Sequence, residues 1–204
     1  MPNIHLVCFD LGRVLIRICN DWKHACQVAG VAAPSEITDP ARLSQLNTAS
    51  CQFDVGAIST HQFTETVAPL MGLSPSDVLK LVHAYLRGPY EGAEKLIDDV
   101  RATGVKTACL SNTNETHWAM MSDEKNPNVL PLHKLDYHFA SHLVKARKPE
   151  PKLYEHVERA SGLESAQIVF FDDVPDYVAA AKDRGWHATR SPSTTTRLRR
   201  RGRI

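Results

Sequence analysis

The 204-residue sequence lacks a long hydrophobic run, a strong net charge and the pattern of a secretory leader. No apolar run approaches the roughly 20 residues of a membrane-spanning helix, so we expect no membrane partner. The formal net charge of +1 gives no overall attraction to nucleic acid or to an anionic membrane. The apolar N-terminal stretch has no cationic region before it and is interrupted by Asp10, so we expect no secretory signal.

The cysteines are odd in number and form no CxxC pair, which favours free thiols over a disulfide framework. They are Cys8, Cys19, Cys26, Cys51 and Cys109. Several lie in apolar runs, so we interpret them as reduced, buried small residues of a cytoplasmic protein. The histidines His133, His138 and His142 match no common zinc-ligand spacing and have no cysteine nearby, so we expect no zinc site.

What the sequence does contain is an alternation of apolar strands and amphipathic helices. Apolar runs at 4–10, 106–111 and 167–172 predict buried strands, and 137–141 and 186–190 are shorter strand candidates. Strands that alternate with helices are typical of a parallel sheet with helices on both faces. We therefore predict an α/β fold with a Rossmann-like, three-layer α/β/α core.

One region interrupts this alternation with helical periodicity alone. Apolar side chains recur at helical spacing from Trp22 to Ala29, from Phe63 to Met71 and from Val78 to Leu86. Gly88-Pro89 then ends the helical pattern. The predicted domains are a core of residues 1–16 and 89–204 and a small helical cap of residues 17–88, inserted after the first strand.

Polar side chains stand where three of the predicted strands end. Asp10 follows the first strand, Ser111 and Asn112 stand at the end of the second, and Asp172 and Asp173 at the end of the third. The carboxyl ends of parallel strands open on one edge of the sheet, so these side chains can converge. Each residue taken alone is as consistent with a helix cap, because Asp, Ser and Asn favour helix starts.

Such a cluster has a definite chemistry. Three carboxylates packed together resist ionisation unless a cation neutralises them, and Mg²⁺ suits because it takes oxygen ligands, commonly one or two carboxylates plus substrate phosphate. Ser111, Asn112 and the ammonium of Lys148 are donors suited to phosphoryl oxygens. With its charge offset, Asp10 could attack phosphorus and form an aspartyl-phosphate that water hydrolyses.

Four stretches of the chain resemble the four motifs of the haloacid dehalogenase superfamily, in the expected order and spacing. They read FDLGRVL, LSNTN, RKPEPKLY and VFFDD. The variants are most similar to the sugar-phosphate phosphatase branch, which has a helical cap after the first motif. The resemblance implies a Rossmann-like core, a mobile cap, Mg²⁺ as cofactor and a small phosphorylated metabolite, such as a sugar phosphate, as substrate.

The resemblance also implies a role for each matching residue. Asp10 matches the nucleophile, which is also a metal ligand, and the Gly12 carbonyl matches a second metal ligand. Ser111 and Asn112 match the phosphate-binding position. The remaining matches are Lys148, as the catalytic and phosphate-binding lysine, and Asp172 and Asp173, as the acidic pair that holds the metal directly or through water.

The chain departs from most phosphatases of this superfamily at Gly12, where they carry a second Asp as general acid/base. Glycine keeps the backbone carbonyl but cannot give or take a proton. General acid–base help is typically worth about 10²–10⁴-fold in rate, so we expect slow turnover, good leaving groups, or help from a cap residue or water. Val174 and Tyr177 also stand where relatives often have polar residues.

Two other functions are compatible with the same motifs. A 2-haloacid dehalogenase-type hydrolase would use Asp10 on a carbon–halogen bond, and Gly12 fits it, although the acidic pair argues against it. A catalytically weakened protein would bind a phospholigand without turnover. Asp54 and Tyr90 border the cap and are candidates for substrate contacts or for solvated loop residues. The Arg-rich tail after Asp183 is more typical of a solvated end than of a nucleic-acid site.

Overall fold

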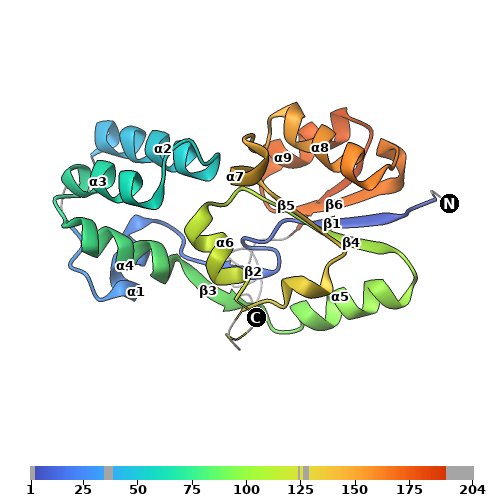
Figure 1. Ribbon diagram of the computed structural model, residues 1–204, viewed down its shortest axis with the longest axis horizontal. Coiled ribbons are helices and arrows are strands. Elements are labelled where there is room, and N and C mark those ends of the chain that lie inside the picture. The colour runs from blue at the N-terminus through green and yellow to red at the C-terminus, as the bar shows by residue number, and fades with distance from the viewer. Residues whose placement is uncertain (1–2, 35–38, 124, 126–128, 192–204) are drawn as a thin grey trace, which may run out of the picture.

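A five-stranded sheet forms the centre of one half of the molecule (Figure 1). The computed structural model describes residues 3–34, 39–123, 125 and 129–191. The strands run parallel in the spatial order β5–β4–β1–β6–β7. Their bounds are Leu6–Phe9 for β1, Lys106–Ser111 for β4, Tyr137–Ala140 for β5, Ile168–Asp172 for β6 and His187–Arg190 for β7. Because β1 is central, the residue that follows it lies in the middle of the sheet's carboxyl edge.

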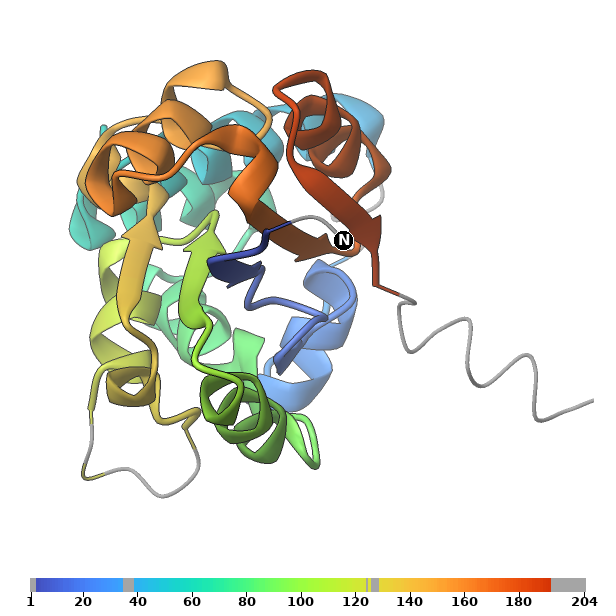
Figure 2. The same ribbon diagram turned by 90° about the vertical axis from the view of Figure 1, so that its right-hand side faces the viewer.

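Helices cover both faces of this sheet, which confirms the predicted three-layer α/β/α core (Figures 1 and 2). On one face lie α8 (Pro151–Ser161) and α9 (Pro175–Asp183), each with proline in its first turn. On the other face lie α5 (Ala93–Ala102) and α6 (Glu115–Met121). Three short elements complete the core, namely η2 (Leu132–Lys134), α7 (Ser141–Val144) and η3 (Ser165–Gln167).

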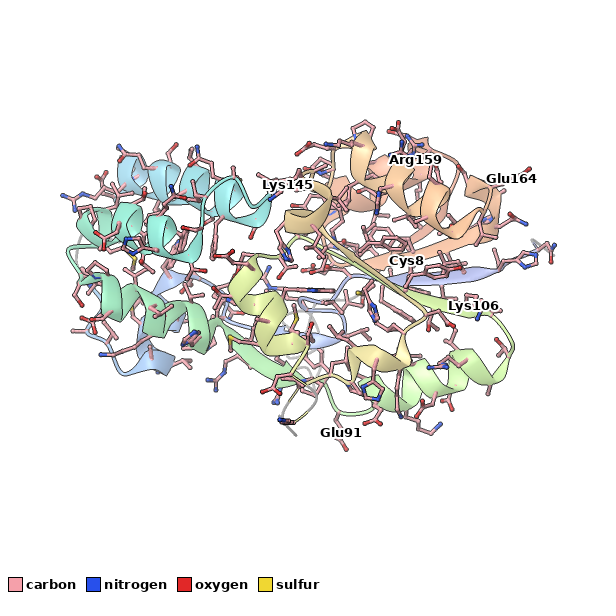
Figure 3. All side chains as sticks on the ribbon, viewed as in Figure 1. Cys8, Glu91, Lys106, Lys145, Arg159 and Glu164 are labelled. Carbon is pink, nitrogen blue, oxygen red and sulfur yellow. The ribbon has the colours of Figure 1, made fainter. Side chains whose placement is uncertain are left out.

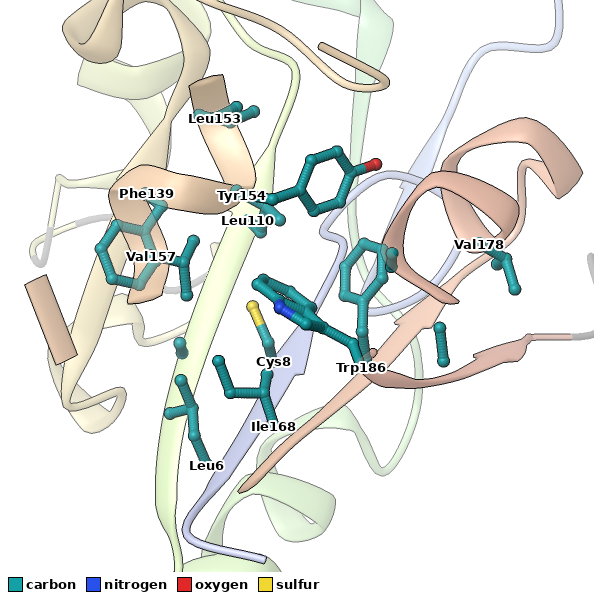
Figure 4. Close-up of a cluster of buried hydrophobic side chains, with 14 of the residues drawn as sticks. Leu6, Cys8, Leu110, Phe139, Leu153, Tyr154, Val157, Ile168, Val178 and Trp186 are labelled. Carbon is teal, nitrogen blue, oxygen red and sulfur yellow. The ribbon is translucent and has the colours of Figure 1, made fainter. Parts of the chain in front are cut away.

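The core beneath α8 and α9 is built from alternate residues of the central strands (Figure 4). Side chains alternate between the two faces of a strand, so Leu6 and Cys8 of β1 point to the same side. Tyr154, Phe170 and Trp186 meet there edge to face, with ring centroids 5.4–6.3 Å apart. Phe170 is fully buried directly beside the strand end that carries the acidic pair, so this packing fixes that end.

Four helices form a separate unit at the other end of the molecule (Figure 1). They are α1 (Trp22–Ala29), α2 (Pro40–Asp54), α3 (Thr60–Met71) and α4 (Pro75–Tyr85). Their apolar faces bury a second hydrophobic cluster, in which the rings of Phe53 and Phe63 stack 4.4 Å apart. This unit is the helical insertion expected from the sequence, and we call it the cap.

Two short antiparallel strands join the cap to the core, and the sequence patterns did not predict them. These are β2 (Ile16–Ile18) and β3 (Leu86–Pro89). Leu86 was expected on the apolar stripe of the helix that became α4, yet the helix ends at Tyr85 and Leu86 begins β3. A strand of three or four residues is too short for a period of two to be distinguished from the end of a helix.

Three further expectations concern the chain as a whole. Each of the five cysteines is a free thiol, and all except the half-buried Cys51 are buried. Within the described part of the chain, no helix combines the length and apolar character needed to cross a bilayer. In the Arg-rich tail after Asp183, Arg184 pairs with Glu155 and Glu158, and Arg190 donates to the Asp173 carbonyl. Residues 192–204 of the tail lie outside the described residues.

Candidate active site

Three carboxylates gather at the carboxyl edge of the sheet. Asp10 follows β1, and its N–H continues the strand ladder by donating to the Phe171 carbonyl at 2.8 Å. Asp172 ends β6 and Asp173 follows it. One oxygen from each carboxylate lies within 4.8 Å of the others, and no other such group of acidic, histidine or cysteine side chains occurs among the residues that the structure describes. Hard oxygen donors at this spacing fit a magnesium ion.

The ammonium of Lys148 bridges two of these carboxylates. Its Nζ donates to Asp10 Oδ1 at 2.9 Å and to Asp172 Oδ2 at 2.5 Å, and its side chain is 1% exposed. The rings of Phe170 and Tyr177 flank the ammonium, with centroids 5.4 and 5.2 Å away. The predicted residues Asp10, Lys148 and Asp172 are therefore in direct contact.

One ammonium does not balance three carboxylates. Burial raises the pKa of Asp10, and the charge of Asp172 adds to this effect while Lys148 opposes it. Burial would lower the pKa of Lys148, but the charges of Asp10 and Asp172 outweigh it and raise that pKa above its usual range, so the lysine stays protonated. The site keeps an excess of negative charge, which a divalent cation would offset.

Asn112 holds the backbone of Lys148 with its side chain. Its Oδ1 accepts from the Lys148 N–H at 2.8 Å, and its Nδ2 donates to the Lys148 carbonyl at 3.1 Å and to the Tyr177 hydroxyl at 3.3 Å. Ser111 is buried at the end of β4, beside this contact. The structure thus places Asn112 against Lys148, with its amide engaged in positioning that lysine, and buries Ser111 one residue earlier in the chain.

Gly12 lies against β2, the strand that leads from the core into the cap. A Cβ at this position would lie 3.3 Å from Cδ1 of Ile18, which belongs to β2. The two residues line a cavity of 60 Å³ together with Ser111, Tyr85 and His117. The next residue, Arg13, has a left-handed backbone with φ of 60°, and its guanidinium lies 3.9 Å from Asp173.

His117 is a neutral contact between the core and the cap. Its Nε2–H donates to the Val82 carbonyl of α4 at 2.8 Å, while Nδ1 accepts from Nδ2 of Asn114 at 3.1 Å. Its ring stacks on Tyr85, with centroids 5.7 Å apart. Burial lowers the pKa of His117 to about 4, so the ring is uncharged at neutral pH. Both ring nitrogens are engaged, which leaves neither to replace the acid missing at Gly12.

The remaining candidate residues lie elsewhere. Asp54 lies where the cap meets the core, with its carboxylate 3.6 Å from Arg147. Tyr90 lines a groove beside α5 and not the 60 Å³ cavity. His138 and His142 each pack against the ring of Trp118. No sequence pattern indicated His117, Tyr85 or Ile18 as site residues, because they meet only when the cap is docked on the core.

Family comparison agrees with this geometry. A family model described as a haloacid dehalogenase-like hydrolase matches residues 22–185. The chain belongs to this family. The membership confirms the superfamily that the four motifs resembled; the finer sugar-phosphate branch is not distinguished by it.

Several proteins of known sequence or structure resemble the chain. It is 29% identical over 106 residues to Phosphatase MT3486 of Mycobacterium tuberculosis (strain CDC 1551 / Oshkosh), a match that covers 52% of this chain and 46% of that protein. The matched part thus spans less than half the length of that relative.

Solved structures of the family share the fold. HAD family enzyme bt-2542 of Bacteroides thetaiotaomicron superposes with a TM-score of 0.81 at 20% identity, covering 94% of this chain and 95% of that one. Another structure of the same enzyme, with a TM-score of 0.77, is a complex with magnesium and inorganic phosphate. L-2-haloacid dehalogenase of Xanthobacter autotrophicus matches with a TM-score of 0.63 at 20% identity, covering 98% of this chain and 84% of that one.

Proposed function

We propose that the protein is a Mg²⁺-dependent phosphatase that hydrolyses a small phosphorylated metabolite through an aspartyl-phosphate on Asp10. The observation that carries the proposal is the convergence of Asp10, Asp172 and Asp173 around the ammonium of Lys148. Sugar phosphates are the expected substrate class, because the four motifs are most similar to that branch of the family. A named phosphatase relative and a family structure that holds magnesium and phosphate support the same reaction type.

Each residue has a defined part in this reaction. Asp10 forms the bond to phosphorus as the bond to the leaving oxygen breaks, and water then attacks phosphorus, releases phosphate and restores the carboxylate. Lys148 holds Asp10 and Asp172 with two of its three N–H donors and offers the third to a phosphoryl oxygen. When bound by Asp10, the Gly12 carbonyl and the acidic pair, Mg²⁺ would neutralise charge on the carboxylates and on the phosphoryl group.

The leaving group must take its proton from a donor other than residue 12, because Gly12 has no side chain. His117, which lines the same cavity as Gly12, has both ring nitrogens engaged. A water molecule in the small cavity is then the proton source, and esters with good leaving groups react fastest. The proposed enzyme is accordingly slow toward alkyl esters.

A phosphate-release screen tests the proposal. Purified protein with Mg²⁺ is incubated with a broad panel of metabolite phosphates, with chelator in parallel, and Asp10→Asn is compared with wild type. We expect phosphate release that needs Mg²⁺ and that Asp10→Asn abolishes. Asp99→Asn, the same change on the exposed face of α5, is the matched control. Wild type that releases no phosphate from any compound, or Asp10→Asn at the wild-type rate, would refute the proposal.

The dehalogenase function has one observation in its favour, namely that Gly12 stands beside the apolar Ile18 of β2 and supplies no acid. It predicts halide release from 2-haloacids that persists in chelator. The phospholigand-binding alternative predicts a higher melting temperature with phosphate mimics and Mg²⁺ while no substrate is consumed. The same purified protein, assayed for halide, phosphate and melting temperature, separates the three functions.

A further inference from the structure

Asp54 is a cap residue whose carboxylate contacts the core. It ends α2, and its Oδ2 lies 3.6 Å from a terminal guanidinium nitrogen of Arg147. The other terminal nitrogen of Arg147 donates to Cys51 Sγ at 3.0 Å, so one arginine of the core contacts one turn of the cap helix. Arg147 directly precedes Lys148. A cap residue therefore holds the segment that carries the lysine of the proposed active site.

The same residue contacts the loop that follows β4. The side chain of Asn114, which caps α6, lies beside the Asp54 carboxylate and acts to lower its pKa. The Asp54 carbonyl contacts the hydroxyl of Ser141, and that hydroxyl accepts from the Thr113 N–H at 2.9 Å. The loop between Ser111 and α6 is thus linked to Asp54 through side chain and backbone alike.

Stability alone does not account for a carboxylate at this position. Burial raises the pKa of Asp54 to about 6, against the opposing charge of Arg147. The side chains of Asp54 and Arg147 are 22% and 26% exposed, and an ion pair this accessible to water adds little stability. The best-attested use of ionic groups withdrawn from water is to fix one arrangement over others. The arrangement fixed here is the docked position of the cap.

We propose that Asp54 is a positioning residue that couples docking of the cap to the placement of Lys148 and of the loop after β4. The proposal rests on the phosphatase function, because it concerns the same site. In this scheme the site is fully ordered when Asp54 is seated between Arg147 and Asn114. Lys148 itself is held on its other side by Asn112, so the two segments move together.

The structure supplies a matched control at the same interface. Lys145 Nζ donates to the Gly56 carbonyl of the cap at 2.8 Å, and Figure 3 shows Lys145 where α7 meets the end of α2. This contact also joins cap to core, but its lysine is exposed and has no hydrogen bond to 111–114 or to Lys148. Lys145→Met thus removes one cap–core hydrogen bond but leaves Asp54 seated between Arg147 and Asn114.

The test compares Asp54→Asn with Lys145→Met by backbone hydrogen exchange in the full-length protein. Two amides report directly on the coupled segments, namely Thr113 N–H, bonded to Ser141, and Lys148 N–H, bonded to Asn112. We expect Asp54→Asn to speed exchange at both by about tenfold, within the range of coupling between contacting residues, and Lys145→Met to leave both unchanged. Equal effects of the two variants, or no effect of Asp54→Asn, overturns the proposal.

Turnover of para-nitrophenyl phosphate with Mg²⁺ gives a second readout. We expect Asp54→Asn to lower kcat about tenfold with little change in KM, and Asp54→Asn/Arg147→Gln to lose no more than the worse single variant. An active wild type with Asp54→Asn at full kcat overturns the proposal. If wild type releases no phosphate from this probe or from any metabolite phosphate, the phosphatase function fails, while hydrogen exchange still decides the role of Asp54.

Discussion

The ammonium of Lys148 donates to a carboxylate oxygen of Asp10 across 2.9 Å, in a site where both residues are buried. Such a pair is costly to form, because both charges lose their water, and breaking it by removing one partner leaves an uncompensated buried charge. Asp172 lies on the other side of the same ammonium at 2.5 Å. The lysine is therefore the internal cation of a site that has more negative than positive groups.

The first prediction concerns this lysine. Lys148→Met keeps an unbranched side chain but removes the charge, so Asp10 and Asp172 face each other without a cation. We expect a loss of about 3–5 kcal/mol in the free energy of unfolding, measured with urea at pH 7 in chelator. Lys152→Met, on the exposed surface of α8, is the control and should change stability by less than about 0.5 kcal/mol. A loss in Lys148→Met as small as that of the control would contradict the prediction.

The second prediction concerns magnesium in the absence of substrate. A cation that binds the folded acidic cluster and not the unfolded chain stabilises the protein by mass action, by about 2.7 kcal/mol at a hundred times its Kd. We expect Mg²⁺ to raise the melting temperature of wild type. Asp173→Asn, a half-buried position next to the solvent side of the cluster, should remove most of that rise. An equal rise in wild type and variant would place the ion elsewhere.

The fold was predictable because its signals are local and repeated. The apolar runs that became β1, β4 and β6 are continuous because both faces of these strands are covered. Glycines and prolines at the helix ends, such as Gly72 after α3 and Pro75 at the start of α4, punctuate the helices of the cap. Such signals can be read within one element at a time.

The site was only partly predictable for the same reason. The proximity of Asp10, Lys148 and the acidic pair could be predicted because each follows a strand end or belongs to a recognisable motif. The engagement of the Asn112 side chain with the Lys148 backbone, and the wall formed by Ile18, Tyr85 and His117, depend on contacts between distant segments. No spacing within the sequence encodes how the cap is seated on the core.

The third prediction concerns stability between pH 4 and 6.5. His117 has a folded pKa of about 4 against an ordinary value of 6.5. Between these values the unfolded chain takes up a proton that the folded protein does not. The contribution of the neutral ring to the free energy of unfolding is fully present above pH 6.5 and is lost as the pH falls toward 4. This loss is on the order of 3 kcal/mol. We expect His117→Gln, which keeps a donor for the Val82 carbonyl, to lose less stability than wild type over this fall in pH.

Asp54 changes stability with pH in the opposite direction and serves as the control. Its folded pKa of about 6 lies above the ordinary 3.8, so its contribution is present below pH 3.8 and is lost as the pH rises through 6. Asp54→Asn should therefore lose more stability than wild type as the pH falls from 6.5 to 4. Urea unfolding across this range, with each variant compared with wild type, measures both differences. Shifts of the same sign in the two variants would show that the assignment of charges is wrong.

The last prediction concerns a variant in which an aspartate at position 12 supplies the general acid that Gly12 lacks. The backbone at Gly12 is not left-handed, so a side chain is conformationally allowed there, and the nearest obstacle is Cδ1 of Ile18, 3.3 Å from the position of a Cβ. Gly12→Asp alone crowds this contact, whereas Gly12→Asp/Ile18→Val removes the obstructing methyl group.

We expect the double variant to raise kcat for alkyl phosphates, up to the factor of about 10²–10⁴ that is typical of general acid–base catalysis. The kcat for aryl phosphates should change far less, because their leaving groups need no proton. Gly12→Asn/Ile18→Val has the same shape without a titratable proton and is the matched control. Steady-state rates on one alkyl and one aryl ester decide the matter. A gain of the same size in the Asn and Asp variants would assign it to the shape of the cavity and not to proton transfer.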